Sequence, residues 1–307
     1  MMMTQTVGEI LANYESDNPG VKGNLCRMLM HGRLGGTGKM IILPVDQGFE
    51  HGPARSFSVN PPAYDPQYHF RLAIDAGLNA IAAPLGFLEA GAARFAGQIP
   101  MILKVNSANA LVPKASAKDQ SITASVADAL RIGASAIGFS VYPGSSMALE
   151  MFEEIAELRR EGAASGLPTV IWSYPRGEDL ASSAETATDV VADAVHFAAL
   201  LGAHIIKVKL SSGQLALDAS RSAYLDGDIE LETMAGRVAH CMDAALARRR
   251  IVVFSGGSRQ GDEQVFLQAR AIRDGGGNGS IIGRNTFQRE RAEAIRMLDT
   301  LVDIYKG

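Results

Sequence analysis

The stretch ATDVVADAVHFAALLGAHIIKVKL, residues 187–210, joins an amphipathic segment to a short, nearly continuous apolar run. The spacing of its apolar residues predicts a helix over 187–203. The run HIIKVKL, 204–210, predicts a strand of a parallel sheet whose outer face is covered by helices. Lys207 and Lys209 both interrupt this strand, and they share one side of it because strand side chains alternate with a period of two.

The same strand-and-helix pattern recurs along the chain, with helical stretches such as 148–166 between the strands. Eight such units in about 250 residues close most economically into a (β/α)8 TIM barrel, so this α/β fold is predicted. An open, doubly wound sheet needs a glycine fingerprint after its first strand, and VDQGFEHGP, 45–53, does not match it. The other predicted strands are 40–47, 78–85, 99–106, 134–142, 168–175, 251–257 and 279–285.

We expect a single barrel domain over 39–307, preceded by a helical N-terminal extension over 1–38. The extension ends in the glycine-rich HGRLGGTGK, 31–39, which lacks the P-loop spacing and leads into a strand, so a flexible loop is expected there. The segment 211–233 is longer than a simple crossover and is expected to lie over one mouth of the barrel.

Composition excludes several classes of protein. The net charge of -4 and the pI near 5.9 argue against nucleic-acid and anionic-membrane partners. No run is apolar and long enough to span a membrane, and the first residues lack the pattern of a signal peptide. Cys26 and Cys241 lie far apart, which indicates no disulfide framework and fits a cytoplasmic location. The six histidines show no metal-ligand spacing, so neither a metal nor another cofactor is expected.

The C-terminal ends of barrel strands carry the candidate catalytic groups. Alternation places Asp46, Lys104 and Tyr174 on the side that faces the barrel axis. Burial and a neighbouring cation should lower the pKa of one lysine of the 207/209 pair, and a neutral amine forms Schiff bases with carbonyl compounds. Alternatively, the lysines extend to the mouth or form a static ion pair with Asp46.

The motif WSYPRG, 172–177, ends the fifth strand and offers two aromatic candidates. Tyr174 could act as an acid or base if neighbouring lysines lower its pKa, or it could simply pack on Pro175. Trp172 is expected in the core unless it forms a wall of the pocket.

Two glycine-containing loops follow the last two strands, namely Ser255-Gly256-Gly257 and Gly283-Arg284. Glycines let backbone N–H groups point into a concavity that binds an anion, and these loops form the usual phosphate site of the fold. A phosphorylated substrate is therefore expected.

In this order, VDQGFEHGP, VYPGS (141–145), LPTVIWSYPRG (167–177), GAHIIKVKL (202–210), SGG and GRN resemble the archaeal-type, or DhnA-type, class I fructose-bisphosphate aldolases. The resemblance covers about residues 38–290. It implies that Lys207, rather than Lys209, forms the Schiff base, that Tyr174 donates a proton and that Asp46 assists proton transfer. It also implies that Trp172 lines the site and that the two glycine loops hold the phosphate of the dihydroxyacetone-phosphate half.

One departure is visible, because archaeal members usually have histidine where this chain has Gln47. Gln47 is expected to contact substrate, and Lys104 or Lys209 to stabilise charge on it. The family forms large homo-oligomers, and the same is expected here. For the second phosphate the candidates are Arg55, Arg176 and Arg259.

The predicted activity is reversible cleavage of fructose 1,6-bisphosphate to dihydroxyacetone phosphate and glyceraldehyde 3-phosphate, a step of glycolysis and gluconeogenesis. Two alternatives stay open at this point. One is a related Schiff-base aldolase or thiolase-like enzyme that acts on another phosphorylated ketose. The other is a non-catalytic sugar-phosphate-binding protein, which would need the phosphate loops but not Lys207 or Tyr174.

Overall fold

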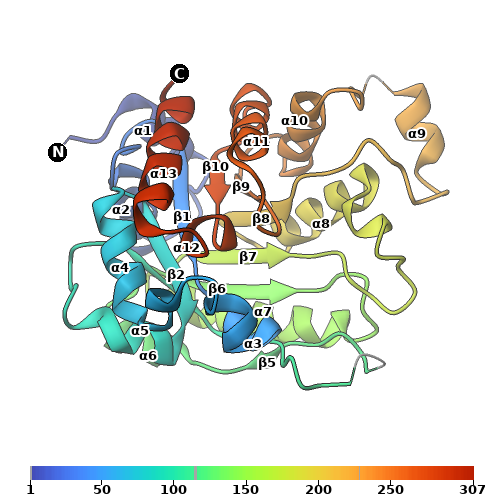
Figure 1. Ribbon diagram of the computed structural model, residues 1–307. Coiled ribbons are helices and arrows are strands. Elements are labelled where there is room, and N and C mark those ends of the chain that lie inside the picture. Colours follow the sequence, from blue (N-terminus) through green and yellow to red (C-terminus); the bar gives the residue numbers. More distant parts are fainter. Residues whose placement is uncertain (1, 114–115, 228) are drawn as a thin grey trace.

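Eight parallel strands form a closed barrel at the centre of the molecule, as predicted. The computed structural model describes residues 2–113, 116–227 and 229–307 (Figure 1), without the side chain of Gln47. The strand order around the barrel is β1-β10-β9-β8-β7-β6-β3-β2. The strands span β1 Met40–Pro44, β2 Ala80–Pro84, β3 Met101–Lys104, β6 Ala136–Val141, β7 Thr169–Ser173, β8 Ile205–Lys209, β9 Ile251–Ser255 and β10 Gly279–Ile281.

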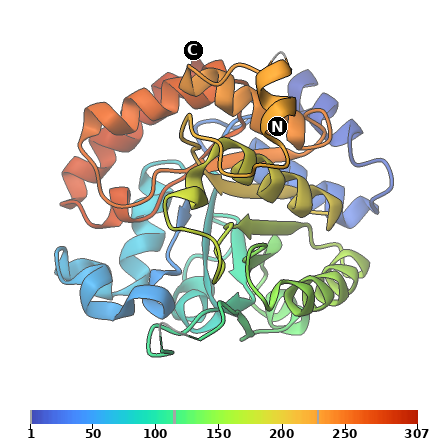
Figure 2. The same ribbon diagram turned by 90° about the vertical axis from the view of Figure 1, so that its right-hand side faces the viewer.

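Helices cover the outside of the barrel and connect its strands (Figures 1 and 2). The predicted helices over 148–166 and 187–203 are confirmed as α7 Ala148–Ala164 and α8 Thr188–Leu200. The remaining outer helices are α3 Gln47–Phe57, α4 Pro66–Asp75, α5 Leu85–Ala92, α6 Val126–Arg131, α10 Met234–Ala244, α11 Asp262–Asp274, α12 Arg284–Phe287 and α13 Arg291–Lys306, with short 3-10 turns η1 Pro61–Tyr64 and η2 Ala184–Thr186.

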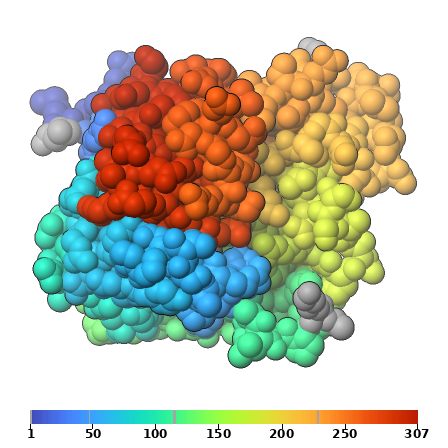
Figure 3. Space-filling model, in the orientation of Figure 1, coloured from blue at the N-terminus to red at the C-terminus, as the bar shows by residue number. Residues whose placement is uncertain are grey.

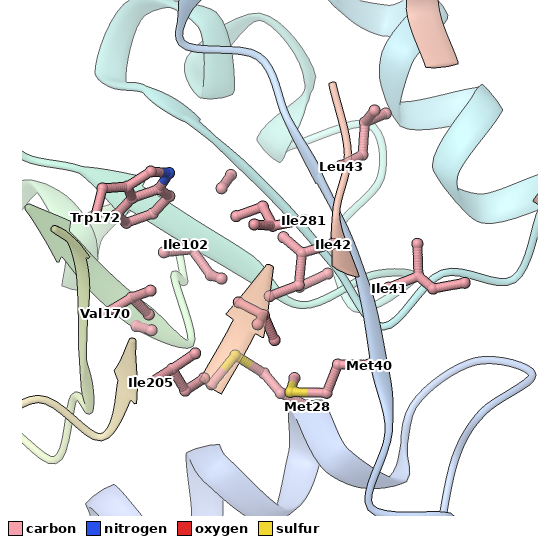
Figure 4. Packing of buried hydrophobic residues seen from close by; sticks show 14 of the residues in the cluster. Met28, Met40, Ile41, Ile42, Leu43, Ile102, Val170, Trp172, Ile205 and Ile281 are labelled. Atoms are coloured by element: carbon pink, nitrogen blue, oxygen red, sulfur yellow. The ribbon is translucent and has the colours of Figure 1, made fainter. Parts of the chain in front are cut away.

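Side chains at alternate strand positions fill the barrel interior. Figure 4 shows Ile42, Ile102 and Trp172 pointing inward, whereas Ile41 points away from them. Gly138 on β6 makes room for the indole, because a Cβ there would lie 2.2 Å from Cζ3 of Trp172. The strand alternation inferred from the sequence is therefore the one that the structure adopts.

The N-terminal segment packs under the barrel through α1 Gln5–Ala12 and α2 Pro19–Met30. The Tyr14 hydroxyl donates to the carbonyl of His204 at 2.6 Å and accepts from the Ile251 N–H at 3.1 Å, so it joins β8 to β9 at their starts. Met28 is fully buried beside Met40 at the same end (Figure 4). These contacts leave the opposite mouth of the barrel as the open one.

Two details differ from the expected elements. The predicted strand 99–106 divides into β3 and the short strand β4 Asn106–Ser107, which pairs antiparallel with β5 Ser121–Ile122. The long connection after β8 contains helix α9 Arg221–Asp226, which lies at the outer edge of the molecule on the side where β8 ends (Figure 1). In the part of the chain that the structure describes, no helix is long and apolar enough to cross a membrane.

Candidate active site

A pocket opens at the C-terminal ends of the strands, the mouth that faces the viewer in Figure 2. It brings together most of the residues that the sequence singled out, from β1, β7, β8, β9 and β10. Its lining includes Asp46, Glu50, His51, Tyr174, Arg176, Lys207, Lys209, Ser255, Gly256, Gly257, Gly283, Arg284 and Asn285. Trp172 and Lys104, which were also expected at the substrate, do not line this pocket, although the Trp172 ring lies next to Lys207.

Lys207 is the buried amine of the site. It lies on the inner side of β8 with only 4% of its surface exposed. Its Nζ is 5.7 Å from the ring centroid of Trp172 and 5.2 Å from that of Tyr174. Burial lowers the pKa of Lys207 from 10.5 to about 8, and this effect outweighs the opposing attraction of Asp46 and Glu50. A pKa of about 8 leaves roughly a tenth of the amine neutral at pH 7, so the expectation of a lowered lysine pKa is confirmed.

Lys104 is a second buried lysine next to the Trp172 ring. Its Nζ lies 5.9 Å from the ring centroid and donates to the carbonyl of Asn106 at 2.7 Å. Burial lowers the pKa of Lys104 as well, against the attraction of Asp46 and Glu50. The sequence indicated Lys209 as the neighbouring cation of Lys207, but the cations that lower the pKa of Lys207 are Lys104 and Arg176.

Lys209 shares the inner side of β8 but lies nearer the mouth, and it forms an ion pair. Its Nζ is 2.9 Å from Oε2 of Glu185. Arg176 approaches the same carboxylate at 4.0 Å and Glu50 at 3.7 Å. The static ion pair considered for the lysines thus exists at Lys209, with Glu185 as its partner where the sequence suggested Asp46.

Tyr174 is a buried phenol directly beside Lys207, with 9% of its surface exposed. The expectation that neighbouring lysines lower its pKa is wrong. Burial, followed by the negative charges of Asp46 and Glu50, raises the pKa of Tyr174 well above 10. The hydroxyl therefore stays protonated at neutral pH, which suits a proton donor and not a resting base.

Trp172 takes the first of the two roles considered for it, because it packs in the core and does not line the pocket. Its ring is fully buried among the barrel core residues, and both buried lysines, Lys104 and Lys207, lie next to it. Its indole N–H is buried and has no hydrogen-bond partner among the residues that the structure describes. A buried unpaired donor is uncommon, and this N–H can donate a hydrogen bond to a new partner.

The end of β1 adds carboxylates to the pocket. Asp46 directly precedes α3, and Glu50 follows it by one helical turn, so both side chains reach the same side. Sequence reasoning missed Glu50, although its place four residues after Asp46 in VDQGFEHGP was a usable signal. Glu185, which precedes α8, was missed because no local pattern marks it. The side chain of Gln47 lies outside the described residues, so its expected substrate contact stays a prediction.

The two glycine loops meet on one side of the pocket, after β9 and β10. Gly257 has φ +72°, a left-handed conformation that glycine adopts without strain. Gly283 directly precedes α12, whose first N–H groups have no partner inside the helix. Of the three arginines considered for a second phosphate, Arg176 lines the pocket, whereas Arg55 and Arg259 do not.

Within 2–113, 116–227 and 229–307, no three His, Cys, Asp or Glu side chains gather as a metal site. The chemistry available from the described side chains is therefore that of an amine, a phenol, carboxylates and anion-binding backbone.

The family and the relatives that this chain resembles are all aldolases. Residues 40–289 match the DeoC/LacD family of aldolases. A probable fructose-bisphosphate aldolase class 1 of Chlamydia muridarum is 35% identical over 307 residues, which cover 95% of this chain and 86% of the relative. The fructose-bisphosphate aldolase class 1 of Thermoproteus tenax is 35% identical over 272 residues, 88% of this chain and 90% of the relative.

A solved structure agrees with these sequence relatives. It is an archaeal fructose-1,6-bisphosphate aldolase whose catalytic lysine is covalently bound to the carbinolamine intermediate of the substrate. It superposes with a TM-score of 0.76 at 30% identity and covers 92% of this chain and 99% of its own. Fold and sequence thus point to the same group of proteins.

Proposed function

This chain belongs to the DeoC/LacD family of aldolases, and we propose that it is a class I fructose-bisphosphate aldolase that uses Lys207 as its Schiff-base nucleophile. The observation that carries the proposal is the lowered pKa of a fully buried lysine beside a protonated tyrosine. Lysine is a nucleophile only when neutral, and burial makes the neutral form available near pH 7.

In the cleavage direction, the neutral amine of Lys207 attacks C2 of fructose 1,6-bisphosphate and gives a carbinolamine. Loss of water then forms an iminium ion. Asp46 takes the proton of the C4 hydroxyl, the C3–C4 bond breaks, and its electron pair moves into the iminium to form an enamine. Glyceraldehyde 3-phosphate leaves. Tyr174 donates a proton to C3, and hydrolysis of the iminium releases dihydroxyacetone phosphate and the free lysine.

The pocket also accommodates the charges of the substrate. The backbone of the two glycine loops, together with Arg284, binds the phosphate on C1. Arg176 and Lys209, both at the pocket surface, are the cations available to the second phosphate. Lys104 lies next to the Trp172 ring and stabilises negative charge that develops during bond cleavage. Cytoplasmic location and assembly into a homo-oligomer stay predictions from the sequence.

Borohydride trapping tests the proposal directly. The protein is incubated with dihydroxyacetone phosphate and sodium borohydride, digested, and mapped by mass spectrometry. We expect a reduced adduct on Lys207 and none on Lys209, which lies on the same side of β8. The variant Lys209→Met should keep the adduct, and Lys207→Arg should lose it. An adduct on another lysine, or cleavage of the bisphosphate by Lys207→Arg, would contradict the assignment.

A further inference from the structure

Arg289, two residues after α12, is a buried arginine outside the pocket lining. Its side chain is only 3% exposed. Nη1 lies 2.6 Å from a carboxylate oxygen of Asp262 and 2.5 Å from one of Glu293, so the guanidinium forms ion pairs with two carboxylates. Nε donates to the carbonyl of Asn285 at 2.6 Å, and Nη2 donates to the carbonyl of Gln260 at 2.9 Å. The guanidinium thus links the chain after β9 to the chain after β10.

Asn285 and Gln260 complete this link. The Asn285 side-chain oxygen accepts from the Gln260 N–H at 2.7 Å, and its nitrogen donates to the carbonyl of Ser258 at 3.0 Å. The Gln260 side chain donates to the carbonyl of Gly256 at 3.1 Å. Because a trans peptide points its carbonyl and N–H in opposite directions, that bond also fixes the direction of the Gly257 N–H. We call Gln260, Asn285 and Arg289 the loop clamp.

A third segment holds α12 from its other side. The Asn60 side chain donates to the carbonyls of Phe287 and Arg289, both at 2.8 Å. The Gln288 side chain donates to the carbonyl of Ser56 at 2.9 Å. Figure 3 shows the two segments in contact, the blue residues that include α3 and α4 against the red C-terminal part. The end of α12 is therefore fixed against the segment around Asn60, and its start is fixed against the chain after β9 through Asn285.

We propose that Arg289, through the loop clamp, is a positioning residue for the phosphate of the substrate. The inference rests on the proposed function, in which the loops after β9 and β10 bind one phosphate. Two loops from different strands bind one anion well only if their spacing is fixed before the anion arrives. A displacement of about 1 Å in such a constellation costs about 100-fold in rate, and Arg289 sets that spacing without touching the phosphate.

The test compares a phosphorylated ligand with one that lacks the phosphate. Borohydride trapping gives the half-saturating concentrations of dihydroxyacetone phosphate and of dihydroxyacetone for wild type, Arg289→Lys and Gln260→Ala. Lysine keeps the charge that Asp262 and Glu293 require but loses the forked contacts. We expect the value for dihydroxyacetone phosphate to rise about 10- to 100-fold, and the value for dihydroxyacetone to change less than about threefold.

Arg237→Lys is the matched control, because Arg237 also binds loop carbonyls, those of Ser211, Leu231 and Glu232. It should leave the preference for the phosphorylated ligand unchanged. Thermal unfolding establishes that each variant is folded. If Arg289→Lys does not fold, the comparison of the two ligands is made with Gln260→Ala alone.

Equal changes for both ligands, or no change for either, would show that the clamp is only structural and overturn the inference. A wild type that forms the adduct but does not prefer the phosphorylated ligand would refute the phosphate site, and the inference with it. A wild type that forms no adduct on Lys207 would instead refute the proposed function.

Discussion

Replacing Lys207 by methionine should abolish Schiff-base formation and, at neutral pH, make the protein more stable. Lys207 is buried, and its pKa falls from 10.5 to about 8 on folding. The unfolded chain therefore binds this proton more tightly than the folded protein does, so protonation favours unfolding. This decrease in the free energy of unfolding is complete below pH 8, and it disappears as the pH rises towards 10.5.

The size of the effect follows from the two pKa values. At 1.36 kcal/mol for each pKa unit, the difference corresponds to about 3 kcal/mol at pH 7. At pH 9.5 most of the unfolded-state amine is still protonated, and the remaining cost is about 1 kcal/mol. Methionine has no ionisable group, so the stability gain of Lys207→Met should fall by at least half between these two pH values.

The assay is urea unfolding of wild type and Lys207→Met at pH 7 and pH 9.5, at equal ionic strength. Groups that do not interact with Lys207 titrate alike in both proteins, so they cancel in the difference. Ile205→Met, on the same inner side of β8, is the control, and its cost of less than about 1.5 kcal/mol should not depend on pH. A Lys207→Met protein that is less stable than wild type at pH 7, or a gain equal at both pH values, would refute the reasoning.

Three further outcomes are expected. The rate of borohydride trapping on Lys207 should rise about tenfold per pH unit below pH 8 and level off above it, as mass spectrometry over a pH series would show. Tyr174→Phe should lower steady-state cleavage about 10²- to 10⁴-fold, because the proton donor is lost, while the trapped adduct still forms; unchanged turnover would exclude this role. Gly138→Ala should cost about 1–3 kcal/mol in urea unfolding, because its Cβ would overlap Trp172; an unchanged midpoint would mean that the indole has room to move.

Local sequence patterns were enough to predict most of the fold. Strand-length apolar runs separated by amphipathic helices predicted all eight barrel strands, because burial on both faces leaves a continuous apolar signature. Alternation along a strand is fixed by backbone geometry, so it predicted that Lys207 points inward. The division of 99–106 into β3 and β4 was not predictable, because β4 pairs with a segment 15 residues away.

The properties of the site depended on side chains that lie far apart in the sequence. Lys207 and Lys209 share a strand face and are indistinguishable by pattern, yet one is enclosed by Trp172 and Tyr174 and the other pairs with Glu185. A pKa is the sum of burial and of charges contributed by several strands and loops, so neither a lysine's neutrality nor a tyrosine's protonation is encoded locally. The sequence by itself determined the barrel and which side chains enter it. Only the tertiary structure decided that the pKa of Lys207 is lowered, because desolvation is a property of the closed barrel and not of one strand.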